Sequence, residues 1–279
     1  MIHYETSWTT DDSQSLFCQG WEPEGELRAV VCLVHGLGEH SGRYTHVADF
    51  FTRARYAVIT FDLRGHGKSG GVRGHSDSFE AFMKDIDLLF QEAEARHAGK
   101  PRFLYGHSLG GLLVLNYALR RKPQVVGVIA TSPGLHSPLT QQKAKIAFAR
   151  TAAVLLPKMS LSTGLDANTI SRDPAVVQVY MEDPLVHGVT TLAMTKACLD
   201  AIPWAFQHAS EFAVPLLLVH GTGDQLTYAS GSQEFARLVK GDCTLKLWEG
   251  LFHETHNEPE KEQVLAYTLG WMDSQLAEL

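Results

Sequence analysis

Short runs of apolar residues alternate along the chain with segments in which apolar residues recur at helical spacing. Six of the runs predict strands, and because they are almost continuously apolar they should be covered on both faces of a sheet. These runs are Ala29–His35, Tyr56–Asp62, Arg102–Gly106, Val125–Ser132, Pro215–His220 and Thr244–Trp248. Helices are predicted over Phe79–Arg96, Leu109–Arg120, Ser232–Val239 and Pro259–Glu278. Alternating strands and helices are typical of an α/β fold.

Two further segments at the start of the chain, Tyr4–Thr9 and Ser15–Trp21, predict a leading antiparallel pair of strands. With them, the expected fold is a mostly parallel eight-stranded sheet flanked by helices.

The segment from Gly134 to Ser210 interrupts this alternation, because it contains helical pieces and prolines but no strand run. Such a connection of about 75 residues is far longer than the usual two to six. We therefore predict a helical cap over 134–210, inserted into a core made of 1–133 and 211–279. Its first helical piece, Gln141–Leu156, has a mostly apolar end. We expect this piece to pack on the sheet domain, to line a lipid-sized pocket or touch a membrane, or to do both.

Composition narrows the class of protein. Of 279 residues, 44% are hydrophobic, which excludes intrinsic disorder. Lys and Arg number 24 against 31 Asp and Glu, a net charge of −7 without a basic run. This argues against nucleic acid as a partner and limits any membrane contact to a local apolar one, through the cap. We expect a monomer or a homodimer.

Nothing in the sequence indicates a membrane span, a secretory leader or a metal site. No apolar stretch reaches the roughly 20 residues of a span, and the first residues lack a basic and an apolar region. The four cysteines show neither C-x-x-C nor zinc spacing, at Cys18, Cys32, Cys198 and Cys243. We expect a cytoplasmic protein without metal or cofactor, with placement at the periphery of a membrane as an alternative.

The clearest chemical signal is the segment Gly106-His107-Ser108-Leu109-Gly110, which matches G-x-S-x-G. A predicted strand precedes it and a predicted helix follows it, as this motif requires. Such a turn raises the serine oxygen at the start of a helix, between glycines that let neighbouring backbone pass closely. Ser108 is therefore the predicted nucleophile.

A serine hydroxyl needs a base, and the base needs an acid that orients it, in the chain order serine, acid, histidine. Asp224 lies in the turn after the strand Pro215–His220 and is the predicted acid. The alternative place for the acid, after Val125–Ala130, reads Thr131-Ser132-Pro133 and has none.

The predicted base is His253, which follows the last strand of the sheet. His256 is its rival but lies farther from the strand end. The string from His253 to His256 reads H-E-T-H, one residue short of the zinc motif H-E-x-x-H, so we reject a metal site here.

Acyl transfer also needs donors for the developing oxyanion. The loop His35-Gly36-Leu37-Gly38 follows the first long strand, and we expect the backbone N–H groups of Leu37 and Leu109 to be these donors. The Gly-rich stretch Phe61–Ser69 lacks the spacing of a phosphate-binding loop. We expect it to brace the nucleophile turn.

Together these motifs resemble the α/β-hydrolase superfamily, and within it the monoacylglycerol lipase and lysophospholipase branch. The likeness rests on three stretches of the predicted core and three of the cap: His35–Tyr44, Asp62–Ser69, Gly106–Gly111, Leu155–Leu161, Ser171–Asp173 and Tyr180–Leu185. The resemblance implies that Glu39 and Arg43 shape the pocket floor for a glycerol head and that Tyr180 lies at its alcohol end. Leu37 departs from the alanine of several relatives, which is expected to narrow the acyl path.

The predicted function is therefore a serine carboxylester hydrolase that cleaves monoacylglycerols to fatty acid and glycerol through an acyl-enzyme. A general carboxylesterase or a lysophospholipase is the alternative. A proline-releasing aminopeptidase and a non-catalytic ligand-binding protein of the same fold stay open. The aspartate nucleophile of haloalkane dehalogenases and epoxide hydrolases is replaced here by Ser108, which argues strongly against those enzymes.

Overall fold

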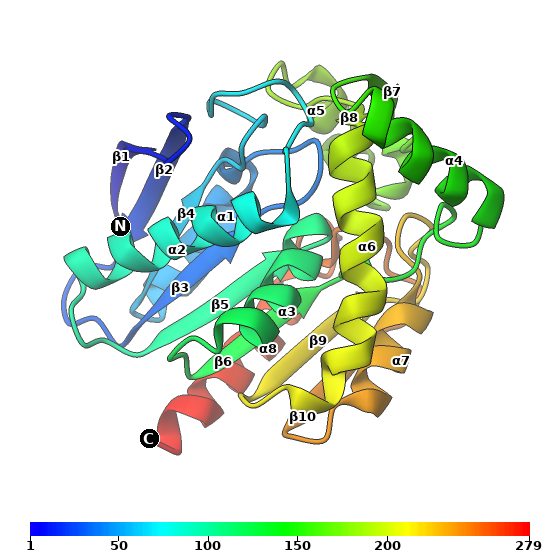
Figure 1. The fold of residues 1–279 in the computed structure, drawn as a ribbon. Helices are drawn as coiled ribbons and strands as arrows, with labels where there is room; N and C mark the ends of the chain where they lie inside the picture. Colours follow the sequence, from blue (N-terminus) through cyan, green and yellow to red (C-terminus); the bar gives the residue numbers. More distant parts are fainter.

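A computed structural model describes residues 1–279 and contains one central eight-stranded sheet (Figure 1). The strand order is β1-β2-β4-β3-β5-β6-β9-β10, and all neighbours pair in parallel except β1 with β2 and β2 with β4. The strands are β1 Ile2–Thr9, β2 Ser15–Glu22, β3 Ala29–Val34, β4 Tyr56–Phe61, β5 Arg102–His107, β6 Gly127–Thr131, β9 Leu216–Gly221 and β10 Cys243–Trp248. The predicted fold class is thus confirmed, with strand bounds that differ by no more than two residues.

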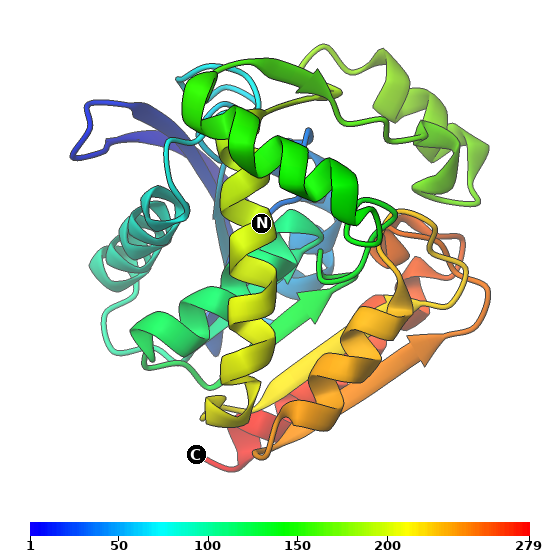
Figure 2. The same ribbon diagram turned by 45° about the vertical axis from the view of Figure 1, so that its right-hand side comes forward.

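Helices cover both faces of the sheet, so the core consists of two apolar layers. On one face lie α1 Thr45–Arg53 and α8 Lys261–Ala277. On the other face lie α2 Phe79–Arg96, α3 Leu109–Arg121, α6 Leu192–His208 and α7 Ala229–Leu238 (Figures 1 and 2). Alternate residues of β3, β4, β5, β6 and β9 enter opposite layers: in β3, Val30 joins the α3 side and Val31 the α8 side. This explains the continuous apolar runs.

The helix α1 was not predicted from the sequence. It has nine residues, and Val47, Ala48, Phe51 and Thr52 form its buried side. A segment this short is marginal as an isolated helix, so it is stabilised by packing on the sheet rather than by its own length.

The segment between β6 and β9 contains more than helices. Its elements are α4 Lys143–Leu155, β7 Ser160–Ser162, α5 Pro174–Glu182, β8 Val189–Thr191 and α6. The expectation of no strands here is wrong, because β7 and β8 form an antiparallel pair. These strands have three residues each and no buried apolar run, so their sequence carries no strand signal.

Helix α4 packs on α6 and not on the sheet. Its small buried residues Ala149 and Ala153 contact Leu192 of α6. Packing on the sheet domain was therefore the wrong interpretation of this helix. Helix α6 continues from the β7–β8 pair down along the face of the sheet (Figure 2), where its residue Ala205 joins the core layer around α3. The division into a core and a cap over 134–210 stays a prediction.

A helix that crosses a bilayer must combine length with a continuous apolar surface. No helix of this structure combines the two to that extent.

Candidate active site

Ser108 lies in a sharp turn between β5 and α3, with backbone angles φ 55° and ψ −114°. Such a conformation costs a non-glycine residue about 1–3 kcal/mol. The neighbouring glycines make the turn possible: a Cβ on Gly106 would lie 2.3 Å from the Gly110 carbonyl oxygen, and one on Gly110 would lie 2.1 Å from that of Val34. The surrounding structure therefore holds Ser108 in a strained position at the start of a helix.

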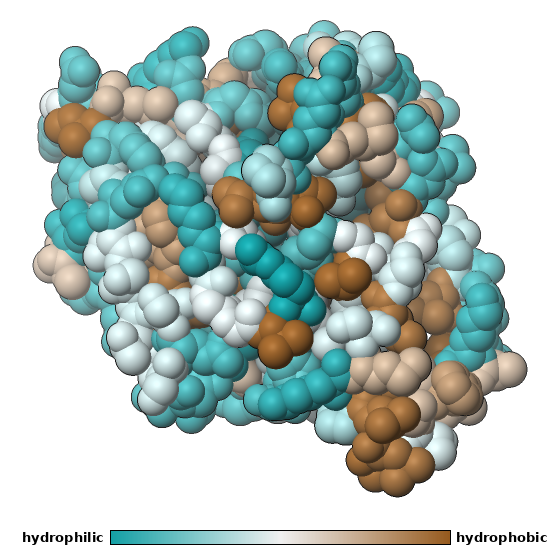
Figure 3. Space-filling view, turned by 90° about the horizontal axis from the view of Figure 1, so that it is seen from above, coloured by the Kyte–Doolittle hydropathy of each residue, from teal (hydrophilic) through white to brown (hydrophobic).

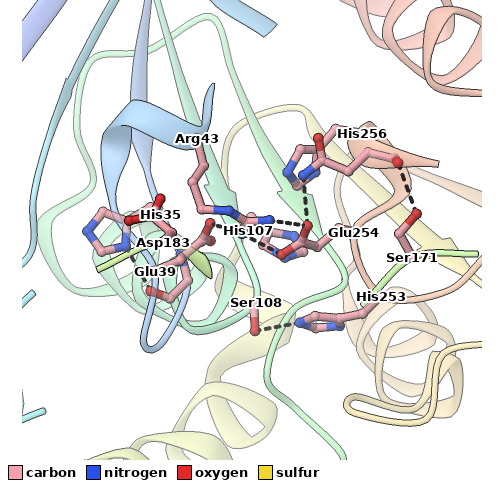
Figure 4. Close-up of polar contacts among 12 residues, drawn as sticks. His35, Glu39, Arg43, His107, Ser108, Ser171, Asp183, His253, Glu254 and His256 are labelled. Carbon is pink, nitrogen blue, oxygen red and sulfur yellow. Dashed lines mark hydrogen bonds and ion pairs between the residues drawn. The ribbon is translucent and has the colours of Figure 1, made fainter. Parts of the chain in front are cut away.

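The structure brings the three residues Ser108, His253 and Asp224 into one hydrogen-bonded line. The Ser108 hydroxyl donates to His253 Nε2 at 2.9 Å (Figure 4). His253 Nδ1 donates to Asp224 Oδ2 at 2.8 Å. The residues come from turns after β5, β10 and β9, which end at the same edge of the sheet. This is the geometry of an activated serine.

The carboxylate of Asp224 is ionised and fixed in place. Its Oδ1 accepts the backbone N–H groups of Leu226 and Thr227 at 2.8 and 3.0 Å, and its Oδ2 accepts the Thr227 hydroxyl at 2.9 Å. Burial alone would raise the pKa of Asp224, but the charge of His253 and hydrogen bonds from His220 and His253 outweigh it and hold this pKa below its usual range.

The same pair sets the protonation of His253. Burial acts to lower the pKa of His253, but the charge and hydrogen bond of Asp224 outweigh burial and raise this pKa above its ordinary value. The rival His256 is fully buried, with its ring stacked on Tyr44 at 5.0 Å between centroids, and it forms no hydrogen bond through either ring nitrogen. Of the two candidates, only His253 contacts Ser108.

Two backbone N–H groups lie beside Ser108 without a partner in the protein. Leu37 and Leu109 line the same cavity as Ser108, and neither amide donates to a backbone or side-chain acceptor. Leu109 is the first residue of α3, where the helix itself offers no acceptor. A Cβ on Gly36 would lie 3.1 Å from Ser108 Cβ, so glycine lets the loop of Leu37 approach the serine.

The Gly-rich stretch 61–69 contacts this loop rather than the nucleophile turn. The backbone N–H of Leu63 donates to His35 Nε2 at 2.9 Å, and Asp62 Oδ1 accepts the N–H of Ser41 at 2.8 Å. None of its hydrogen bonds reaches residues 106–111. The expected brace of the nucleophile turn is therefore corrected to a brace of the loop that carries Leu37.

A buried ion-pair network lies behind that loop (Figure 4). Arg43 binds Glu254 with two hydrogen bonds of 2.6 and 2.7 Å and Glu39 with one of 2.8 Å. Glu39 also accepts the N–H of Gly36 at 2.6 Å and the hydroxyl of Tyr44 at 2.7 Å. Burial would raise the pKa of Glu39, but the charge of Arg43 prevails and lowers it to about 2. The network ties the loop of Leu37 to the residue after His253.

The three residues assigned to the alcohol end do not all reach the cavity. Glu39 and Tyr180 line it, whereas Arg43 lies behind them, with its guanidinium 4.7 Å from the centre of the Tyr180 ring. Glu254, which the sequence analysis did not single out, lines the cavity as well. Its position next to His253 was the available signal, but a pairing with a residue 211 positions away leaves no mark in the sequence.

The cavity above Ser108 has a volume of about 300 Å³ and two different ends. One end is formed by carboxylates and Tyr180 around Glu39. The other is an apolar arm between α3, α6 and the segment after β6, lined by Leu112, Leu139, Met194, Cys198, Leu199 and Ile202. No group of three or more His, Cys, Asp or Glu side chains is placed to hold a metal ion.

Comparison with known proteins assigns the chain to a family. The model of the family described as serine aminopeptidase, S33 matches residues 25–260. A monoacylglycerol lipase of Mycolicibacterium smegmatis is 36% identical over 92% of this chain and 92% of its own length. The chain belongs to this family of α/β-hydrolases, in its monoacylglycerol lipase branch. Like its relatives there, it is a serine ester hydrolase.

Two further proteins resemble this chain, one of them much longer than it and the other known from a crystal structure. The chain is 41% identical to an uncharacterized abhydrolase domain-containing protein of Dictyostelium discoideum, but spans only 28% of that protein. The crystal structure of a Paleococcus ferrophilus monoacylglycerol lipase superposes with a TM-score of 0.84 at 37% identity, over 99% of this chain and 100% of that one. The α/β-hydrolase fold therefore extends over the whole chain.

Proposed function

We propose that this α/β-hydrolase cleaves monoacylglycerols, with Ser108 as nucleophile, His253 as general base and acid, and Asp224 as the acid that orients it. The observation that carries the proposal is the hydrogen-bonded line from Ser108 through His253 to Asp224 at the floor of a cavity with one apolar and one polar end. The monoacylglycerol lipases among the relatives support the choice of substrate.

In the first half-reaction the Ser108 oxygen attacks the ester carbonyl while its proton passes to His253 Nε2. The carbonyl oxygen becomes an oxyanion that the N–H groups of Leu37 and Leu109 bind. A single such donor lowers the activation free energy by about 3–4 kcal/mol. Collapse of the tetrahedral intermediate breaks the bond to the glycerol oxygen, which takes the proton from His253.

In the second half-reaction a water molecule replaces glycerol. His253 accepts one proton of the water as its oxygen attacks the acyl-enzyme, and the same two N–H groups bind the second oxyanion. The proton then returns to Ser108 as the fatty acid leaves. Asp224 stays ionised throughout and stabilises the imidazolium form of His253.

The two ends of the cavity fit the two parts of this substrate. We assign the acyl chain to the apolar arm, where Leu112 and Ile202 lie. We assign the glycerol head to the end with Glu39, Tyr180 and Glu254, where carboxylate and phenol oxygens offer partners for hydroxyl groups. In this assignment Arg43 does not touch the head but holds both carboxylates.

An ester substrate fits this site better than a peptide with a free amino terminus. The only acidic residues that line the cavity are Glu39 and Glu254, and both are already paired with Arg43. An ammonium group would therefore find no free carboxylate. A lysophospholipid or a simple ester would use the same chemistry, with a different group at the polar end.

We also propose that α4 touches a membrane or micelle surface transiently and so brings the cavity to its substrate. Phe148 and Leu155 are 68% and 78% exposed, and Val154 and Leu156 are exposed beside them. Figure 3 shows a hydrophobic lobe at its lower right, on the side where α4 lies in Figure 1. An exposed patch of this kind is typical of an interaction site. Loss of binding to lipid vesicles in Phe148→Ser/Leu155→Ser, with unchanged cleavage of a dissolved short ester, is the expected result.

The test of the function is kcat/KM on a matched set of substrates. The set contains monoacylglycerols of increasing chain length, p-nitrophenyl esters, a lysophospholipid and a prolyl-arylamide, with Ser108→Ala as the blank. We expect the highest value on a monoacylglycerol. Faster cleavage of short esters than of any monoacylglycerol would reassign the protein as a general carboxylesterase, and cleavage of the arylamide alone would reassign it as an aminopeptidase.

A further inference from the structure

A second buried histidine, His220, lies against the carboxylate of Asp224. It is the fifth residue of β9, and its side chain is fully buried. Its Nε2 lies 3.2 Å from Asp224 Oδ2, the oxygen that also accepts His253 Nδ1. The mechanism described above makes no use of this ring.

The partners of His220 determine which of its nitrogens carries a hydrogen. Nε2 faces two acceptors, the carbonyl oxygen of Thr227 at 3.0 Å and the carboxylate of Asp224, so it must be the N–H. Nδ1 lies 2.8 Å from the hydroxyl of Ser232 on α7, which can donate to it. A neutral ring therefore satisfies both nitrogens, with its N–H donated to the Thr227 carbonyl and lying 3.2 Å from Asp224 Oδ2.

The carboxylate does not depend on His220 for its orientation. Leu226 and Thr227 already hold both of its oxygens through three hydrogen bonds. What His220 adds is positive potential next to Oδ2. Because a carboxylate that shares its charge with another donor attracts a proton less, this potential moderates how strongly Asp224 stabilises the imidazolium of His253.

We propose that His220 is a positioning residue for catalysis, which acts through Asp224 to keep His253 neutral and ready to accept the Ser108 proton. This inference rests on the proposed triad. Other groups face His253 as well: Glu39 and Glu254 favour its charged form, and the neighbouring His107 ring disfavours it. His220 belongs with His107 on the side that keeps the base unprotonated.

The test uses two amide side chains that reproduce one ring nitrogen each. The amide of Gln reaches the place of Nε2, whereas that of Asn reaches only the place of Nδ1, near Ser232. In His220→Asn the pKa of the acid limb of kcat/KM on a p-nitrophenyl ester should rise by about half a unit. At pH values below that pKa, kcat/KM should therefore fall by about threefold. His220→Gln should restore the wild-type limb. Ser232→Ala, which leaves Nε2 in place, should keep it.

The outcomes separate this inference from the function it rests on. An unshifted acid limb in His220→Asn, or a shift that His220→Gln does not reverse, would overturn the role of His220 while Ser108→Ala stays inactive. Full activity of Ser108→Ala would instead overturn the proposed function together with this inference. If His220→Asn does not fold, His220→Leu/Ser232→Ala replaces it, because that pair removes the hydroxyl left without a partner, and the same upward shift is required.

Discussion

The backbone N–H of His187 donates a hydrogen bond of 2.8 Å to the carbonyl of Gly38, the residue after Leu37. This bond joins the segment between β6 and β9 to the loop of Leu37, the proposed oxyanion donor. The contact is close: a Cβ on Gly38 would lie 2.3 Å from the His187 carbonyl oxygen, and Gly38 has φ +77°. The position of Leu37 and the position of this part of the predicted cap are therefore linked.

Gly38→Ala should lower both stability and kcat/KM, and Gly99→Ala is the matched control. Gly99 has φ +71° but nothing within 4 Å of its added Cβ. Both variants carry the left-handed backbone cost of about 1–2 kcal/mol, so any further loss in Gly38→Ala reports the contact with His187. A shift of 1 Å at the loop can cost about 100-fold in rate. Equal unfolding free energies and wild-type kinetics for both variants would contradict the link.

Ser108→Ala should abolish turnover while the protein stays folded. Removal of the nucleophile from a triad that acts as a unit lowers kcat by about 10⁶. The alanine keeps the backbone strain of position 108, so the unfolding free energy should change little. The measurement is kcat together with a thermal unfolding curve. A residual rate above one thousandth of wild type would exclude Ser108 as the nucleophile.

The strands, and the meeting of Ser108, His253 and Asp224, could be predicted because their signals are local. Val30 and its neighbours in β3 form a continuous apolar run, and Ser108 sits in a motif whose glycines serve the turn itself. Glu254 and His220 could not be identified in this way. Their roles come from contacts with Arg43 and Asp224, and those contacts exist only when the sheet has brought the strand ends together.

The course of α4 was unpredictable for a related reason. An apolar helix end looks the same in sequence whether it packs on a sheet or stays exposed. Ala149 and Ala153 contact α6, and Phe148 points away from it into solvent. Which face is covered depends on the neighbouring helix, whose placement depends in turn on β7 and β8.

The acid limb of kcat/KM should have a pKa above the ordinary histidine value of about 6.5. A general base works only when neutral, and Asp224 raises the pKa of the proposed base His253, so activity should be lost as pH falls through that raised value. Asp224→Asn should lower the rate by about 10⁴ through the wrong histidine tautomer and move the limb to lower pH. A pH profile of both proteins tests this, and an unaffected rate in Asp224→Asn would place the acid elsewhere.

His107 should make the fold sensitive to acid. Burial, together with the nearby charge of His253, lowers the pKa of His107 to about 4 in the folded protein, against about 6.5 when unfolded. The unfolded state then binds more protons as pH falls from 6.5 towards 4, and folding loses up to about 1.4 kcal/mol per pH unit from this group. His107→Gln should flatten the dependence of unfolding free energy on pH in that window. Equal slopes in the wild type and His107→Gln would contradict the assignment.

Arg43 should be more important for stability than an ordinary ion pair, because its two carboxylate partners have no other cation. Arg43→Ala leaves Glu39 and Glu254 charged and buried, and such a change costs about 3–5 kcal/mol. Arg43→Lys keeps the charge but cannot bind Glu254 through two nitrogens, so its loss should be smaller and still measurable by urea unfolding. In Arg43→Ala/Glu254→Gln the penalty should fall below that of Arg43→Ala alone, since one of the stranded charges is gone. If Arg43→Lys unfolds like the wild type, the paired geometry contributes nothing beyond charge, and the network holds the loop of Leu37 less firmly than its distances indicate.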